Sequence, residues 1–306
     1  MGSRQSNGGF GLKRFHWRRD WLPEWLGNDL AEVPKHRYRV RILEETATDR
    51  EQMREKFREV AQHALDDARE RLRAPAKYSL DPLGAPDLAI GYPSLLHEQT
   101  LKGYLGETLA GLVAENFDVC GFDDWEVPAF LFRFHKEEFR QLERLRQIGG
   151  QARRQPGRTG DDCVAFRRDS GGGITAVLVC EAKCTSDHRS GLIADAHKKL
   201  NAETNWRPLD THQLLEVVSS YDDATSRAWT TSLAKLLFAS ARPSGWERAD
   251  CIVYVCGRRP SAAGRTGWLR RDQPHHSYHR DRQLEAVEIH LEGVGDVIQA
   301  VYGDPV

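Results

Sequence analysis

The sequence lacks long apolar runs and an excess of either charge. Its most apolar run, residues 174–180, is far shorter than the roughly 20 residues that a helix needs to cross a bilayer, so we expect no membrane association. The chain has 44 Lys and Arg against 45 Asp and Glu, a net charge of -1, which excludes a strongly basic, histone-like or ribosomal type of protein. The N-terminal residues are polar and hold no apolar core of a secretory signal, so we expect a cytoplasmic protein.

Paired cysteines and the common catalytic signatures are also missing. The six cysteines include no C-x-x-C pair, and Cys180, Cys251 and Cys256 lie in apolar runs, where cysteine behaves as a small hydrophobe. This usage is typical of a reduced, cytosolic protein. The sequence has no G-x-x-x-x-G-K-[ST] phosphate loop, no legible Ser-His-Asp arrangement, and no zinc-finger or helix-turn-helix pattern. A P-loop nucleotidase, a serine hydrolase and a self-contained sequence-reading module are therefore not indicated.

Aromatic residues are frequent enough for a folded chain. Eight Trp, eight Tyr and eleven Phe are too many apolar anchors for a disordered protein. Helical and strand-like patterns alternate, which favours an α/β or α+β fold over an all-α or all-β one. We expect strands over 38–43, 125–134, 162–168, 174–184, 251–256 and 284–291, a loop over 149–160, and helices over 47–72, 97–117, 136–148, 191–201, 211–219, 228–240 and 294–302.

The composition divides the chain near residue 90. Residues 1–90 are expected to form an N-terminal, α-rich extension, made of an irregular aromatic arm up to residue 37 and the charged helix over 47–72. The proline-rich stretch after this helix is the best candidate for a boundary, which leaves 91–306 as the second domain. Aromatic residues are favoured interface anchors, so the extension is also a candidate partner-binding surface, through Trp17, Trp21 and Trp25.

One group of charged residues stands at the end of an apolar strand. Residues two apart in a strand point to the same face, so Glu181 and Lys183 project side by side from the strand over 174–184. Asp162 begins the neighbouring strand of a hairpin that turns at the glycines of 171–173, where its carboxylate can lie beside that of Glu181. The alternative is a solvated hairpin end whose ion pair contributes little.

Two adjacent carboxylates repel each other unless a cation lies between them. Mg²⁺ prefers oxygen ligands and keeps several waters, which suits two carboxylates and a phosphate. A neighbouring lysine can orient or help deprotonate a metal-bound water and stabilise the charge that develops on the phosphate. Asp162, Glu181 and Lys183 therefore indicate the chemistry of phosphodiester hydrolysis.

At these residues the sequence resembles the PD-(D/E)XK nuclease superfamily. The motif is Asp162, eighteen intervening residues, and then Glu181-Ala182-Lys183, with Gly160 completing a G-x-D. The resemblance implies a restriction-endonuclease-like core, with a central mixed β-sheet flanked by helices. It also implies Mg²⁺ or Mn²⁺ held by Glu107, Asp162 and Glu181, with Lys183 as a fourth catalytic residue. Asp161 remains the alternative to Asp162, because the two adjacent residues point to opposite faces.

Glu107 corresponds to the glutamate that the superfamily commonly carries on a helix before the hairpin. It lies opposite the leucine stripe of the expected helix over 97–117, a position that normally faces solvent. Its side of the helix is built from small residues, which suggests the close approach of another element and lets Glu107 reach the sheet edge. The alternative is an ordinary exposed glutamate. The small residues are Gly103, Gly106, Ala110, Gly111 and Ala114.

A closer similarity, over residues 101–183, is to the nuclease component of the Hachiman anti-phage defence system. It implies a superfamily 2 helicase partner and action on DNA. The exonuclease branch of the superfamily carries a Q-x-x-x-Y motif, but Gln213 is followed by Val217, so an endonuclease is favoured. The rival hypothesis is a catalytically inactive DNA-binding or assembly subunit that keeps the fold.

Two basic stretches are candidate phosphate contacts. Residues 133–168 hold ten Lys or Arg against five acidic residues, and residues 258–282 hold seven Arg against two Asp. Lys198 and Lys199 follow the E-x-K strand and could also contact phosphate. The alternative for each is an ordinary solvated surface.

Overall fold

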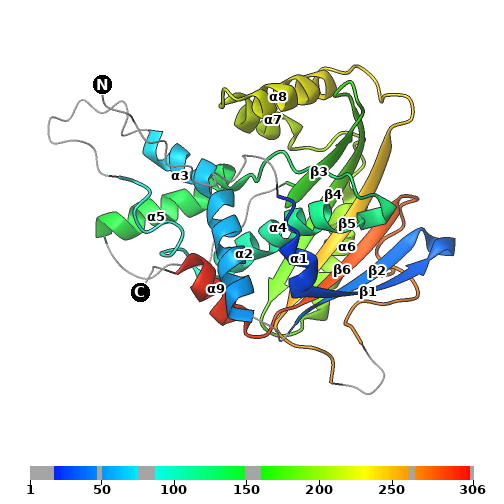
Figure 1. Cartoon of the computed structure of the whole chain (residues 1–306), viewed down its shortest axis with the longest axis horizontal. Coiled ribbons are helices and arrows are strands. Elements are labelled where there is room, and N and C mark those ends of the chain that lie inside the picture. Colours follow the sequence, from blue (N-terminus) through cyan, green and yellow to red (C-terminus); the bar gives the residue numbers. More distant parts are fainter. Residues whose placement is uncertain (1–16, 47–49, 75–86, 149–159, 262–265, 304–306) are drawn as a thin grey trace, which may run out of the picture.

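A six-stranded mixed β-sheet runs through the computed structural model, which describes residues 17–46, 50–74, 87–148, 160–261 and 266–303 (Figure 1). The strands β2, β6, β5 and β4 are parallel neighbours, and the edge strands β1 and β3 pair antiparallel with β2 and β4. In their order across the sheet the strands are Leu26–Val33 (β1), Tyr38–Glu45 (β2), Gln283–His290 (β6), Glu247–Cys256 (β5), Ile174–Thr185 (β4) and Cys163–Arg168 (β3).

Helices cover both faces of this sheet, so the described part of the chain is an α/β protein (Figure 1). The α-helices are Trp21–Trp25 (α1), Arg50–Ala64 (α2), Asp66–Arg73 (α3), Glu98–Asn116 (α4), Lys136–Ile148 (α5), Ser190–Ala202 (α6), Thr211–Ser219 (α7), Ala224–Leu237 (α8) and Val294–Tyr302 (α9). Short 3-10 turns are Pro34–His36 (η1), Val119–Gly121 (η3) and Phe132–Phe134 (η4). None of the helices in these ranges has the length and apolarity that crossing a bilayer requires.

Strand β4 separates two apolar cores, because its side chains alternate between the faces of the sheet. Leu178 and Cys180 belong to the core under α4, α2 and α9. Val177 and Val179 belong to the core under α6, α7 and α8. Both faces of β4 are therefore covered, as its continuous apolar run predicts.

Most expected elements are confirmed, and two differ for identifiable reasons. The strand expected over 125–134 is wrong: only Glu126 pairs with β3, as an isolated bridge to Phe166, and Pro128 cannot donate a ladder hydrogen bond. The single helix expected over 47–72 is instead two, because α2 ends at Ala64 and α3 begins at Asp66, where carboxylates favour a new helix start. Residues 149–159 of the expected loop and the proline-rich stretch over 75–86 lie outside the described residues.

The N-terminal segment is not an irregular arm where the structure describes it. Residues 17–37 include α1 and the edge strand β1, and residues 1–16 lie outside the described ranges. β2 is parallel to β6, so the segment before residue 90 supplies two strands of the same sheet as the C-terminal half. The sheet therefore contains strands from both sides of residue 90, where the domain boundary was expected. Trp17 and Trp25 are buried and Trp21 packs against the same core, so the basis for a tryptophan-rich partner surface is lost.

Buried charges link this segment to the rest of the sheet. Arg41 of β2 is fully buried, and its Nε lies 2.7 Å from Glu285 Oε1 on β6. Its Nη2 lies 2.7 Å from Asp118 Oδ1, just before η3. The second oxygen of Glu285 accepts a hydrogen bond from the Cys120 backbone N–H at 2.6 Å. The charges are thus satisfied only when all three chain segments are assembled.

Helix α4 approaches the sheet through glycine. A Cβ added at Gly106 would lie 3.3 Å from Ala182 Cβ and 3.6 Å from Cys184 Cβ on β4. At Gly111 an added Cβ would lie 2.5 Å from the ring of Phe130, while at Gly103 nothing lies within 4 Å. The close approach expected from the small residues is therefore confirmed at Gly106 and Gly111, and Gly103 is open.

These contacts predict opposite effects for two substitutions on one helix. Gly111→Ala should lower the free energy of unfolding by about 1–3 kcal/mol, because the methyl overlaps Phe130. Gly103→Ala should raise it by up to about 1 kcal/mol, because alanine is the better helix former and the space is empty. Urea unfolding of both variants measures this difference, and equal effects would contradict the packing described here.

Candidate active site

Strand β4 carries Glu181 and Lys183 on its α6 side. The two residues alternate with Ala182 and Cys184, which face α4, and share the parity of Val177 and Val179. The Glu181 side chain is only 1% exposed, whereas that of Lys183 is 26% exposed. A carboxylate so deeply buried requires charged or hydrogen-bonding partners.

Asp162 lies beside Glu181, as the hairpin predicts. Cys163 of β3 pairs with Cys180 of β4. Asp162, just before Cys163, and Glu181, just after Cys180, are therefore the next two residues along this antiparallel pair. The Ala182 backbone N–H donates a hydrogen bond of 2.8 Å to Asp162 Oδ2. This bond fixes the Asp162 side chain against the E-x-K segment.

Two lysines surround the Glu181 carboxylate. Lys183 Nζ lies 2.5 Å from Glu181 Oε1. Lys199 Nζ, which comes from α6, lies 2.5 Å from Glu181 Oε2 and 3.4 Å from Asp162 Oδ1. The Lys199 ammonium thus sits between the two carboxylates, where it reduces their mutual repulsion.

The proton affinities follow from these neighbours. Burial, together with the charge of Asp162, raises the pKa of Glu181 to about 7, although Lys199 and Lys183 act in the opposite direction. Burial alone would lower the pKa of Lys199, but Asp162 and Glu181 outweigh burial and raise it. Lys199 therefore stays charged at neutral pH, while Glu181 can change its protonation near neutrality.

Asp161 has different surroundings from Asp162. Its backbone N–H donates to Asp210 Oδ2 at 2.7 Å. Burial and the charges of Asp210 and Glu203 raise the pKa of Asp161 to about 7, while Arg248 and Lys199 oppose this shift. Asp162, and not Asp161, makes the hydrogen bond to the E-x-K strand.

Glu107 is buried, but on the α4 side of the sheet. Its neighbour Gly106 faces Ala182 and Cys184, the β4 residues that point away from Glu181. Glu107 Oε1 lies 3.6 Å from His135 Nε2. Its Oε2 is buried and has no hydrogen-bond partner among the described residues. The structure brings Asp162, Glu181 and Lys183 together and places Glu107 beside His135. Glu107 is buried, so the alternative of an exposed glutamate is wrong.

The fit of a divalent cation rests on two carboxylates. Asp162 and Glu181 supply the hard oxygen donors that Mg²⁺ and Mn²⁺ prefer. Within the described ranges, no group of three or more His, Cys, Asp or Glu side chains is arranged to hold a metal ion. The expected third ligand, Glu107, is thus not part of a ligand set here, and water or substrate oxygens would complete the coordination.

Sequence reasoning placed Lys199 only as a possible phosphate contact on a helix surface. The structure instead turns it toward Glu181 and Asp162. The signal available in the sequence was its place in the helix directly after the E-x-K strand. Asp210, which binds the Asp161 backbone, carried no sequence signal.

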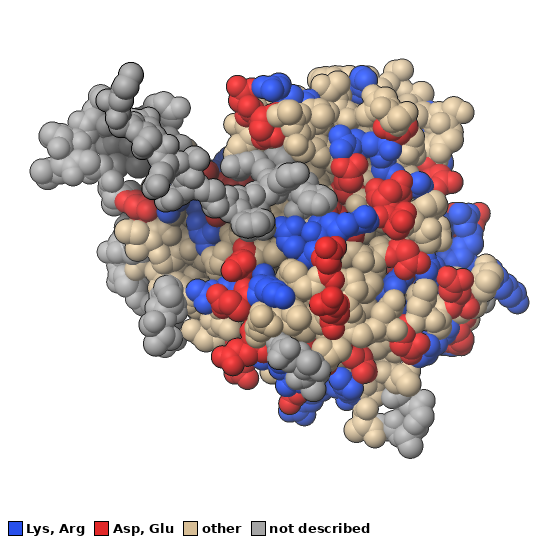
Figure 2. Space-filling model, viewed as in Figure 1, with Lys and Arg blue, Asp and Glu red and all other residues tan. Residues whose placement is uncertain are grey.

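Many of the described cations in the two basic stretches lie beside carboxylates. Arg133 pairs with Asp67 and Glu216, and Arg168 pairs with Glu126. In the second stretch, most arginines lie beside a carboxylate: Arg258 with Asp187, Arg259 with Glu44, Arg270 with Asp272 and Arg271 with Asp29. Positive and negative side chains are accordingly interspersed over the face seen in Figure 2, without one dominant basic surface there.

No known family model matches this chain, and no curated protein matches it significantly.

Proposed function

We propose that this chain is a metal-dependent DNA nuclease that hydrolyses phosphodiester bonds at Asp162, Glu181 and Lys183. The observation that carries the proposal is the buried Glu181 carboxylate, which lies beside Asp162 and within 2.5 Å of both Lys183 and Lys199. A purely structural ion pair gains little from this arrangement, because burying two carboxylates side by side is costly. Perturbed pKa values and clustered charges are typical of catalytic sites.

In this proposal each residue has a defined task. Asp162 and Glu181 would hold Mg²⁺ or Mn²⁺, which supplies Lewis acidity and lowers the pKa of bound water. Lys183 is more exposed than Asp162 and Glu181. It orients the attacking water and stabilises negative charge on the phosphate. Lys199 keeps the paired carboxylates close together before and after the reaction, because its ammonium lies between them.

The wider context is also a proposal. The six-stranded mixed sheet with helices on both faces is compatible with a restriction-endonuclease-like core, and the E-x-K on a central strand next to a hairpin aspartate supports it. The similarity to the Hachiman nuclease component supports a role in anti-phage defence in the cytoplasm, together with a superfamily 2 helicase. With a net charge of -1, the chain has little bulk attraction for DNA, so such a partner would help to deliver it to DNA.

The rival is a catalytically inactive DNA-binding or assembly subunit. The observation in its favour is that Glu107 stays with His135 on the α4 side of the sheet. A plasmid assay separates the two proposals: supercoiled DNA is incubated with the full chain and Mg²⁺, Mn²⁺ or EDTA, with and without a helicase partner. Nicking that requires the metal supports the nuclease. No metal-dependent nicking under any of these conditions favours the inactive subunit.

The two adjacent aspartates give a matched pair of variants. Asp162→Asn should lower the nicking rate by on the order of a hundredfold and shift its Mg²⁺ dependence to higher concentration, because it removes a charge beside Glu181. Asp161→Asn should leave the rate within about threefold, since Asp161 is joined to Asp210 through its backbone N–H, which the substitution keeps. Mg²⁺ titrations of both variants test this assignment. Equal effects, or a larger one for Asp161→Asn, would contradict it.

A further inference from the structure

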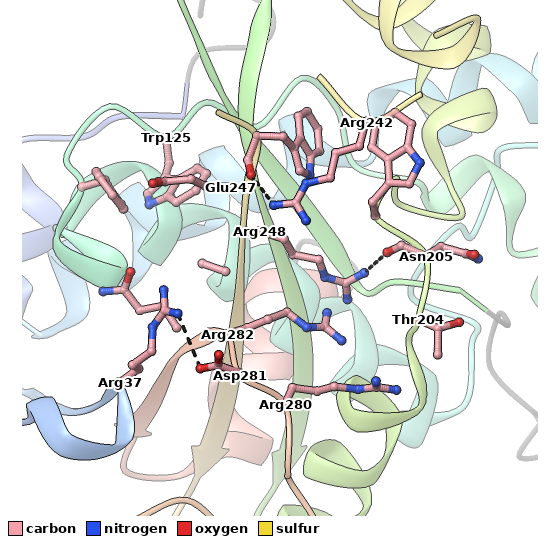
Figure 3. A pocket seen from close by; sticks show the side chains of 15 residues that line it. Arg37, Trp125, Thr204, Asn205, Arg242, Glu247, Arg248, Arg280, Asp281 and Arg282 are labelled. Atoms are coloured by element: carbon pink, nitrogen blue, oxygen red, sulfur yellow. Dashed lines mark hydrogen bonds and ion pairs between the residues drawn. The ribbon is translucent and has the colours of Figure 1, made fainter. Parts of the chain in front are cut away.

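A cavity of about 430 Å³ opens where β5 and β6 begin, and residues from both faces of the sheet line it (Figure 3). This volume lies in the range of sites that take small molecules. Its lining is rich in cations, with five arginines against the two carboxylates of Glu247 and Asp281. The arginines are Arg37, Arg242, Arg248, Arg280 and Arg282.

Two of these arginines are held in place by one buried carboxylate. Asp250 is fully buried, and its Oδ1 lies 3.1 Å from Arg248 Nε and 3.2 Å from Arg282 Nη1. The Tyr278 hydroxyl donates to the other oxygen of Asp250 at 2.8 Å. Both guanidinium groups are thereby fixed before any ligand arrives, which reduces the entropy that binding costs.

The chain that ends α6 holds a second set of contacts. Arg280 Nε donates to the Asn201 carbonyl at 2.7 Å, and Arg248 Nη1 donates to the Asn205 carbonyl at 2.8 Å. Figure 3 shows Arg248, Arg280 and Arg282 projecting in the same direction, toward Asn205 and Thr204. Carbonyl acceptors orient these cations without neutralising their charge.

The site keeps unused hydrogen-bond donors. Arg248 Nη2 and Trp246 Nε1 are buried and have no hydrogen-bond partner among the described residues. The Arg248 side chain is only 6% exposed. Burial lowers the pKa of Arg282; Asp250 opposes this shift, while the like charges of Arg248 and Arg280 add to it. A bound anion would accept from the unused donors and relieve the repulsion among the arginines.

Aromatic rings form part of the same wall. Trp206 and Trp246 line the cavity with ring centroids 5.4 Å apart and planes at 87°. Trp206 is half-buried, so part of its indole surface is accessible to a ligand. Arginines beside an indole surface match the phosphate and the base of a nucleotide, since every base can stack on an aromatic ring.

We propose that this cavity binds a nucleotide, with its phosphate on Arg248, Arg280 and Arg282 and its base against Trp206. The ligand is either a free mononucleotide or the phosphorylated end of a DNA strand. The Arg248 side chain is on the same face of the sheet as Glu181, and it is close enough to influence the charge of Asp161. The proposal does not depend on nuclease activity, because it concerns binding alone.

Titration calorimetry in EDTA tests the proposal on the full chain, with dAMP, inorganic phosphate, and a short single-stranded oligonucleotide bearing either a 5′-phosphate or a 5′-hydroxyl. The variant is Arg280→Ala, because Arg280 makes no ion pair with a buried carboxylate within the described ranges. Its matched control is Arg227→Ala on α8, which removes an exposed arginine outside the cavity.

The unmodified chain should bind dAMP or the 5′-phosphorylated strand, and Arg280→Ala should weaken this binding about tenfold, the effect of losing one charge-assisted hydrogen bond. Arg227→Ala should leave the affinity unchanged. Tighter binding of the phosphorylated strand than of dAMP identifies a strand end as the ligand, and the reverse order identifies a free nucleotide. Binding of inorganic phosphate as tight as that of dAMP, no binding of either nucleotide ligand, or an unchanged affinity in Arg280→Ala would overturn the proposal. Because no cleavage occurs in EDTA, these outcomes do not depend on whether the chain is a nuclease.

Discussion

Lys183→Ala is expected to lower metal-dependent nicking by at least about a hundredfold while the protein stays folded. The Lys183 side chain is 26% exposed, and Glu181 keeps its contact with Lys199 when Lys183 is truncated. The loss of one ammonium should therefore affect the reaction far more than the packing. Nicking rates at saturating Mg²⁺ and circular dichroism of the same preparation measure the two effects together.

The control for this variant is Lys235→Ala, which removes an exposed lysine from α8 and should nick plasmid at the unmodified rate. Glu181→Gln provides an independent check, because it keeps the shape of the side chain and removes its charge. Both Lys183→Ala and Glu181→Gln should be inactive and folded. Full activity in either variant would remove the basis for this catalytic assignment.

Arg41→Ala is expected to lower the free energy of unfolding by about 3–5 kcal/mol, the cost of removing one partner of a buried ion pair. The substitution leaves Glu285, which is fully buried, without its closest cation at 2.7 Å. It also removes one of the contacts to Asp118 that link β2 to the segment after α4. Urea unfolding followed by circular dichroism measures the loss.

Arg271→Ala is the matched control, because its pair with Asp29 is largely exposed and should contribute less than about 1 kcal/mol. The same reasoning predicts that a chain lacking residues 1–45 will not fold, since it lacks β1 and β2. A stable Arg41→Ala variant, or a folded truncated chain, would show that the sheet does not depend on its N-terminal strands.

Local patterns in the sequence determined much of the fold. The helices α5, α7 and α9 begin and end at the expected residues, and the hairpin of β3 and β4 follows from two apolar runs joined by glycines. The position of Glu181 and Lys183 on one face also follows from the period of a strand. These features depend on interactions within a few residues, so sequence periodicity is enough to predict them.

Other features depended on residues far apart in the chain. Strand β1 has no regular alternation of apolar and polar residues and buries only Leu26, so it forms because its backbone pairs with β2, which periodicity does not reveal. Glu107 was expected at the sheet edge, yet the packing of Gly106 on β4 places its helix on the opposite face. The sequence could not show which face of the sheet α4 would cover.

The sequence by itself determined that a carboxylate and a lysine would project together from a central strand beside Asp162. Only the tertiary structure decided that Lys199 would stand between the two carboxylates, and that arginines from positions as distant as 37 and 282 would line one cavity. The physical reason is that strand phase is a local property, whereas the surroundings of a side chain depend on how helices and loops pack on the sheet. That packing depends on contacts between segments remote in sequence, which a local pattern does not encode.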